Sequence, residues 1–390
     1  MYRNTRFEQL LKGLSRGEFE NMVSNRESDK HSKGFSSWHQ LVTMMYAQLS
    51  GCRSLRELET GFNNQAAHHY HLGCREVKRT TLSDANAKRD AELFMDVCRS
   101  LMGKVNRKLR RDVNDFLYLL DSSPITLKGR GYDEWTLEDR TRNTQGVKLH
   151  LLLNSKTEVP HYFNITAANI NDITDATHVE IEQGATYVFD KGYCDYNWWH
   201  EINTSDAKFV TRFKKNASLV IVKAQAIPTA AREVVLKDYI VKFKNKHPRA
   251  KHINNYEAPL RQIVIDRPDH DTPLILATND FERSAEEIAA CYKKRWGVEL
   301  YFKWVKQNLK IKRYLGRSEN AIRIQIATAL ISYLLMALHR HTYRVKSSMK
   351  ELLVLVSTSL FQRPEIDQYL MKKRRNEAQD EMLQRQEVLI

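Results

Sequence analysis

The chain has 390 residues, with 62 Lys and Arg against 47 Asp and Glu, which gives a formal net charge of +15. This length suggests two or three domains, and the basic excess favours a polyanionic partner such as nucleic acid over a merely basic or ribosome-associated protein. No apolar run reaches the roughly 18 residues of a membrane span and the start lacks the apolar segment of a signal peptide, so we expect a cytoplasmic protein without a membrane partner.

The region 1–110 is predicted to be helical. Apolar side chains recur there at three- and four-residue steps, as on one face of a helix that Gly51 ends: Trp38, Leu41, Val42, Met45 and Leu49. Ser54 and Glu57 predict a capping box for the next helix, and Ser83 can cap a third. Small helices with short turns and basic residues are similar to a helix-turn-helix that binds DNA ends, although any small helical bundle would show this pattern.

Beyond a basic connector at 104–111, short apolar runs indicate strands. They lie at residues 116–120, 147–153, 159–165, 187–189 and 207–213. Helical stretches or loops alternate with some of these runs, so the fold class is predicted to be mixed α/β.

Residues 215–278 differ from their surroundings, because four β-rich runs are separated by polar turns and no long helix is evident. We expect a β-rich insertion here. From Ser284, which can form a capping box with Glu287, a helix is expected to about Lys310, and another from 318 to 341.

These patterns together predict the domain organisation. A helical N-terminal DNA-binding region would cover 1–110, and the two parts of an α/β core would cover 111–214 and 279–345. The β-rich insertion would cover 215–278 between them, and a C-terminal helical tail 346–390.

The helix expected after Ser284 carries an unusual face. At about 100° per residue, Tyr292, Arg295, Glu299 and Lys306 share a face only about 60° wide, with Lys303 and Lys310 beside them. A core helix would not carry these side chains, and a solvated helix usually alternates its charges. One carboxylate surrounded by cations suits a metal ligand whose neighbours hold phosphates.

Two aspartates are candidates for the remaining metal ligands. Asp121 and Asp190 each directly follow a strand-like run, and active sites of α/β sheets collect at the carboxyl ends of strands. Taken singly, each aspartate could simply close a strand as a turn residue. Together with Glu299 they predict a site that holds divalent ions.

The three acids and their surroundings resemble the DDE transposases of bacterial insertion sequences, in particular the branch with a Tyr-Arg-Glu-Lys signature. The segments that carry the resemblance are LLDSSPI around Asp121, FDKGYCD around Asp190 and YKKRWGVELYFKWVKQNLKIKR around Glu299. The longer interval, from Asp190 to Glu299, agrees with the β insertion that this branch carries there. Asp195 also lies near Asp190, but Asp190 directly follows the strand.

The resemblance implies an RNase-H-like catalytic core that holds two divalent ions, normally Mg²⁺, with Mn²⁺ as a substitute. Asp121 would be shared by both ions, while Asp190 and Glu299 would each complete one site. Two hard cations held by carboxylates can activate a nucleophile and neutralise charge during phosphodiester cleavage. Water would first free a 3′-hydroxyl, which would form a hairpin with the opposite strand before the hairpin is opened and joined to target DNA.

The resemblance also implies the partners: the terminal inverted repeats of the element, target DNA, and a second protomer, because two ends must be paired. Tyr292, Arg295 and Lys306 would grip phosphates near the cut, with Lys303 and Lys310 beside them.

A flipped base at a hairpin end is held by aromatic stacking. Trp296 borders the charged face and could stack on such a base, although the commoner role of Trp198, Trp199, Trp296 and Trp304 is to anchor a core. Lys148, on a strand between the two aspartates, could also reach phosphate.

Three alternatives make different demands on the sequence. Another RNase-H-like nuclease, such as a junction resolvase, would share the carboxylates but would not need the Tyr-Arg-Glu-Lys face. A domesticated, non-catalytic DNA-binding protein predicts the loss of at least one of the three acids, all of which are present. A basic scaffold protein would leave the composition of the face around Glu299 unexplained.

Overall fold

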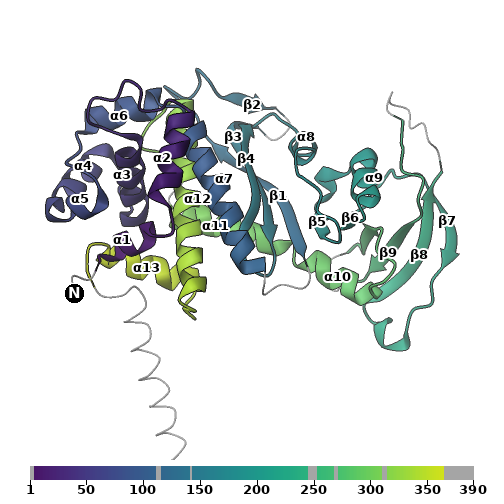
Figure 1. Cartoon of the computed structure of the whole chain (residues 1–390). Coiled ribbons are helices and arrows are strands. Elements are labelled where there is room, and N and C mark those ends of the chain that lie inside the picture. Colours follow the sequence, from purple (N-terminus) through teal and green to yellow (C-terminus); the bar gives the residue numbers. More distant parts are fainter. Residues whose placement is uncertain are drawn as a thin grey trace, which may run out of the picture. The chain divides into compact units, whose positions relative to one another are not determined.

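The computed structural model describes residues 4–110, 116–140, 143–244, 253–267, 271–309 and 314–363 (Figure 1). The chain forms two compact units, one made of 1–108 with 304–390 and the other of 109–303. Lys310 and residues 364–390 of the predicted tail lie outside the described residues.

The first unit is helical, as the sequence predicts for its N-terminal part. Its helices are α1 (Arg6–Leu11), α2 (Arg16–Asn25), α3 (Ser37–Ser50), α4 (Leu55–Asn63), α5 (Ala66–Leu72), α6 (Arg79–Lys88), α7 (Glu92–Leu109), α12 (Glu319–Thr342) and α13 (Met349–Ser359). Helix α12 packs against α1, α3, α6 and α13 and is therefore the central helix of this unit.

Helix α12 is long and apolar enough to cross a membrane by length and composition alone, and it is the one such helix among the described residues. However, 94% of its most apolar window is buried inside the protein. Its side chains thus form the core of the helical unit, which accounts for the apolar composition without a lipid environment.

The helix ends in this unit confirm two predictions and correct two others. Gly51 ends α3 in the left-handed conformation with φ 74°, and the Ser54 side chain accepts the Glu57 backbone N–H at the start of α4. The Glu57 carboxylate, however, accepts the N–H of Arg53, so the full capping box was wrong. Ser83 does not cap a helix either, because α6 already begins at Arg79, whose N–H is satisfied by the Glu59 carboxylate from α4.

The second unit is built on one sheet of ten strands. They are β1 (Leu117–Thr126), β2 (Leu137–Asp139), β3 (Thr144–Asn154), β4 (Pro160–Ala167), β5 (Thr186–Phe189), β6 (Lys208–Arg212), β7 (Leu219–Ala224), β8 (Val235–Phe243), β9 (Leu260–Ile265) and β10 (Leu274–Thr278). The order is β2-β3-β1-β5-β6-β10-β9-β8-β7, with β4 on β3. Strands β1, β5 and β6 are parallel, and all other pairs are antiparallel.

The four β-rich runs predicted within 215–278 are strands β7 to β10. They do not form a sheet of their own, because β10 pairs with β6 and so extends the central sheet. The predicted domain boundaries, including the status of this segment as an insertion, stay a prediction.

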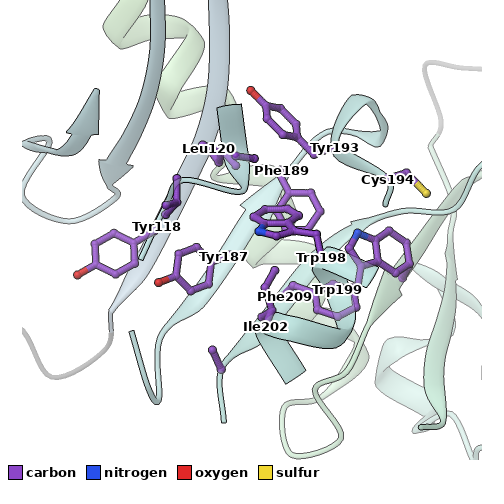
Figure 2. Packing of buried hydrophobic residues seen from close by; sticks show 14 of the residues in the cluster. Tyr118, Leu120, Tyr187, Phe189, Tyr193, Cys194, Trp198, Trp199, Ile202 and Phe209 are labelled. Atoms are coloured by element: carbon purple, nitrogen blue, oxygen red, sulfur yellow. The ribbon is translucent and has the colours of Figure 1, made fainter. Parts of the chain in front are cut away.

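The core of the second unit lies on one face of the sheet (Figure 2). Alternate residues of β1 and β5, among them Leu120 and Phe189, pack there against α9 (Tyr196–Thr204). Trp198 and Trp199 of α9 are both buried in this cluster, which confirms their role as core anchors. Asp195 caps α9 by accepting the N–H groups of Asn197 and Trp198, a helix-capping role.

The opposite face of the sheet meets the segment after Ser284. The capping box of Ser284 and Glu287 is confirmed, but the single helix expected up to Lys310 was wrong. Two residues separate helix α10 (Ala285–Lys293) from α11 (Trp296–Asn308). The connecting turn is tightened by three-residue hydrogen bonds, from Arg295 N–H to the Tyr292 carbonyl at 3.0 Å and from Gly297 N–H to the Lys294 carbonyl at 2.8 Å.

Candidate active site

Asp121 and Asp190 lie side by side on neighbouring parallel strands. Parallel pairing of β1 with β5 ends at Leu120 opposite Phe189, and each aspartate is the next residue on its strand's path. Asp190 directly follows β5 as predicted, but β1 continues to Thr126, so the expectation that Asp121 ends its strand was wrong. The reason is that β1 keeps its second neighbour, since Asp121 still pairs opposite Leu151 of β3.

Glu299 of α11 reaches the same region through Arg295. The Arg295 guanidinium lies 3.5 Å from an Asp121 carboxylate oxygen and 2.6 Å from a Glu299 carboxylate oxygen. Close packing of α11 on β1 makes this contact possible, because a Cβ on Gly297 would lie only 3.2 Å from the Leu119 methyl group. The structure thus joins Asp121, Arg295 and Glu299 despite the break between α10 and α11.

Arg212, at the end of β6, is a site residue that the sequence analysis missed. It pairs with Asp190 and its guanidinium lies 6.0 Å from the centre of the Tyr292 ring, on which Arg295 also lies at 5.9 Å. Its one signal in the sequence was its place in the run 207–213, which predicts a strand; the parallel pairing of this strand with β5, which brings Arg212 to Asp190, is a finding of the structure. Tyr292 itself is buried beneath the two arginines.

The two aspartates have opposite pKa shifts. Burial raises the pKa of Asp121 to about 6; the charges of Glu299 and Asp172 add to the increase, while the Ser122 N–H and Arg295 oppose it. Burial also raises the pKa of Asp190, but the hydrogen bond from Arg212 and further positive charge outweigh it, so that this pKa lies below its ordinary value. Of the two aspartates, Asp121 is therefore the one whose ionised form is less well stabilised, and added positive charge would stabilise it.

The donor set fits a hard divalent cation, because carboxylate oxygens are the ligands that Mg²⁺ prefers. Within the described residues, however, no three His, Cys, Asp or Glu side chains gather closely enough to hold a metal ion. Arginines hold the acids instead, with Arg295 between Asp121 and Glu299 and Arg212 on Asp190. A cation added between Asp121 and Glu299 would supply the charge that Arg295 supplies here.

The remaining residues predicted to contact DNA differ in their exposure to solvent. Lys303 is exposed on α11 and Lys306 is half-buried on the same helix. Trp296 is 57% exposed, which makes it the exception among tryptophans expected to anchor cores. Together with Leu119, Leu300, Lys293 and Lys294, it lines an open cavity of about 440 Å³.

Lys148 cannot serve as a phosphate contact in this arrangement. Its side chain is 3% exposed, its ammonium group lies 2.9 Å from the Asp172 carboxylate, and it also donates to the Ile170 carbonyl at 2.7 Å. The sequence position between the two aspartates was informative, but the side chain is buried beneath the site.

Comparisons with known proteins identify the family of this chain. A family model described as "Transposase DDE domain" matches residues 117–335, and one described as a domain of unknown function, DUF4372, matches residues 2–75. A protein of Sinorhizobium fredii whose name describes it as a transposase, y4zB, is 38% identical over 73% of this chain and 78% of its own length. A transposase named for the insertion sequence element IS5377 of Geobacillus stearothermophilus is 28% identical over 64% of this chain and 65% of its own.

A solved structure with a similar fold is the piggyBac transposase in a synaptic complex with hairpin DNA. The superposition has a TM-score of 0.50 with 10% sequence identity, and it covers 95% of this chain and 82% of the other. The family match spans more than half of the chain and includes Asp121, Asp190 and Glu299. This chain therefore belongs to the DDE transposases, as a transposase of a bacterial insertion sequence.

Proposed function

We propose that this chain binds the terminal inverted repeats of its insertion sequence, cleaves the DNA at those ends and joins them to target DNA. The observation that carries the proposal is that Arg295 contacts both Asp121 and Glu299, while Asp190, which follows the neighbouring parallel strand, pairs with Arg212. Three acids from three separate segments would repel one another without cations. Asp121 and Asp190 on neighbouring parallel strands, with Glu299 of α11 joined to Asp121 through Arg295, suit phosphodiester chemistry more than structural support.

The sheet topology supports an RNase-H-like catalytic core. Strands β4, β3, β1, β5 and β6 are adjacent in this order, the first three antiparallel and the last three parallel. We assign these strands to the core and strands β7 to β10 to the insertion. The helices of residues 1–110 would then be the DNA-binding region.

Asp121, Asp190 and Glu299 would hold the two divalent ions, Mg²⁺ or Mn²⁺, with Asp121 shared. The ions would supply nucleophile activation and charge neutralisation at the scissile phosphate. Without the ions, Arg295 pairs with Asp121 and Glu299, and Arg212 pairs with Asp190. Both arginines are partly exposed, so a DNA backbone could reach them. We assign phosphate contacts to Arg295, whose guanidinium lies over the Tyr292 ring.

The lysines of α11 would extend this grip along the DNA. Lys303 and Lys306 occupy successive turns of the helix, and Lys310 follows them in the sequence. Cations at such spacing can neutralise consecutive phosphates. Membership of the Tyr-Arg-Glu-Lys branch is part of this proposal.

Trp296 is our candidate for holding a flipped base at a hairpin end. Trp296 is exposed, and the cavity that it lines is also lined by leucines, among them Leu119 and Leu300, and by Lys293 and Lys294. An aromatic surface with neighbouring cations favours base stacking. The piggyBac transposase forms a synaptic complex with hairpin DNA, which gives the hairpin route a precedent. A homodimer would pair the two ends of the element, because both ends must be cut and joined.

The helical N-terminal region offers a surface for end recognition. Lys78, Arg79 and Lys88 are exposed on and just before α6, whose Leu82 and Asn86 are buried. A helix fixed by its buried face with cations on the other is suited to a DNA groove.

The function is tested by incubating the protein with DNA that carries the element's ends, a target plasmid and Mg²⁺. We expect nicked, hairpin and joined products on a denaturing gel, and none when Ca²⁺ or EDTA replaces Mg²⁺. Cleavage without joining would favour another RNase-H-like nuclease. Binding of the ends with no cleavage in Mg²⁺ or Mn²⁺ would overturn the proposal in favour of a non-catalytic DNA-binding protein.

A further inference from the structure

A buried ion pair lies next to the proposed catalytic carboxylates and is shielded from solvent. Lys148 of β3 is 3% exposed and the Asp172 side chain, at the start of α8 (Asp172–Ala176), is 9% exposed. Removing two charges from water costs free energy, and the attraction between the charges often does no more than offset this cost. A buried ion pair therefore need not stabilise the fold. Its position in the fold therefore needs another explanation.

The pair is connected to Asp121 by two short hydrogen bonds. The Ser122 hydroxyl donates to the Asp172 carboxylate at 2.7 Å, and the Ser122 backbone N–H donates to the Asp121 carboxylate at 2.8 Å. Successive side chains of a strand point to opposite faces, so Asp172 holds β1 from the face opposite to Asp121. Ser122 passes this restraint to the carboxylate on the other face.

The same pair is connected to Asp190 through the chain. Helix α8 packs against the short helix η2 (Lys191–Tyr193), which begins immediately after Asp190. Lys148 also fixes the segment that leads into α8 by donating to the Ile170 carbonyl at 2.7 Å. One buried ion pair thus contacts the structures that carry both aspartates.

We propose that Lys148 and Asp172 are positioning residues that fix the distance between Asp121 and Asp190 for the ions of the reaction. Neither is a catalytic residue, because both act through Ser122 and through the packing of α8 on η2. Partners that orient metal ligands in this way are typically worth a 10- to 100-fold change in metal affinity. The inference rests on the proposed metal-dependent activity.

The test compares Mn²⁺ affinity of the intact protein with that of Asp172→Asn, measured by electron paramagnetic resonance of free Mn²⁺. We expect the affinity to fall by about tenfold or more, with end-DNA binding retained. Cleavage should fall at low Mn²⁺ and recover at high Mn²⁺, because the ligands are present but misplaced. Lys148→Arg, which keeps the ion pair, should retain most of the affinity.

The matched control is Asp238→Asn. Asp238 and Arg261 also form a buried ion pair, at 2.6 Å between β8 and β9, far along the sheet from β1. If Asp172→Asn lowers Mn²⁺ affinity no more than Asp238→Asn does, the inference is overturned and the pair is merely structural. If Asp172→Asn does not fold, Ser122→Ala, which removes only the connecting hydroxyl, is measured by the same criterion.

The positioning role and the proposed function fail differently. Absence of Mn²⁺ binding and of cleavage in the unaltered protein would contradict the proposed function. If the unaltered protein binds Mn²⁺ and both Ser122→Ala and Asp172→Asn bind it with the same affinity as the unaltered protein, only the positioning role is contradicted.

Discussion

Asp121 is held in its folded environment at an electrostatic cost. Burial raises its pKa to about 6 although Arg295 lies 3.5 Å away, because Glu299 and Asp172 contribute negative charge nearby. Perturbed carboxylates of this kind are concentrated at functional sites. The folded protein therefore keeps an acid that would be more stably ionised in the unfolded chain.

Asp121→Asn should accordingly stabilise the metal-free protein at pH 7. Because the folded-state pKa lies above the unfolded value, the cost of ionising Asp121 is present above about pH 6 and disappears below about pH 4. From a shift of about two pKa units we expect at most about 2–3 kcal/mol at pH 7. Urea unfolding of both proteins at pH 4 and pH 7 measures this difference.

The exposed Asp84→Asn serves as the control for that experiment, because it removes an acid without removing a buried charge. A loss of stability in Asp121→Asn at pH 7, or a gain of equal size at both pH values, would contradict the electrostatic account of this residue.

At the scale of elements, the sheet depends on a close approach between β1 and β3. Gly146 of β3 has φ 143°, and a Cβ there would lie 2.1 Å from the Ile125 carbonyl oxygen. A side chain would therefore force apart the strand that carries Asp121 and its neighbour that carries Lys148.

Gly146→Ala should destabilise the protein by at least about 2 kcal/mol, since both the backbone angle and the contact exclude a side chain. Gly103→Ala in helix α7 is the matched control, because nothing lies within 4 Å of its added Cβ. The control should gain about 0.5–1 kcal/mol from improved helix propensity. Thermal unfolding of the two variants measures this difference in stability, and a similar melting temperature for both would contradict the role given to Gly146.

Elements with a local signal could be predicted from the sequence, whereas those set by tertiary contacts could not. The strands β7 to β10 and the caps at Ser54 and Ser284 follow from residues close in sequence. The break between α10 and α11 does not, because it coincides with the packing of Gly297 on Leu119. The start of α6 likewise depends on Glu59 from another helix.

The candidate site shows the same division. Arg295 and Glu299, four residues apart, lie close together as the spacing predicts, and Arg295 also contacts Asp121. Arg212 was missed because its role depends on which strand becomes the neighbour of β5, a choice that the order of runs along the chain does not express. Lys148 was recognised as well placed, but its burial beside Asp172 depends on the later helix α8, which supplies that residue.

At the scale of the whole molecule, the net charge of +15 predicts a strong dependence of DNA binding on salt. Lys306→Ala should weaken binding of end DNA and reduce the slope of log affinity against log salt concentration by about 0.9, the value for one phosphate contact. Lys350→Ala, an exposed lysine on α13, is the control. Fluorescence anisotropy at several salt concentrations gives both slopes, and an unchanged slope for Lys306→Ala would remove this residue from the DNA interface.

The central claim is that Glu299 completes a metal-dependent site for cutting DNA. It is tested most directly by cleavage of end DNA in Mg²⁺, comparing the intact protein with Glu299→Gln and with Glu286→Gln on α10 as the matched control. We predict that Glu299→Gln binds the ends but loses cleavage by more than about a hundredfold, beyond the range for residues that only support a ligand, while Glu286→Gln cleaves normally. Equal cleavage by Glu299→Gln and the intact protein would contradict the account.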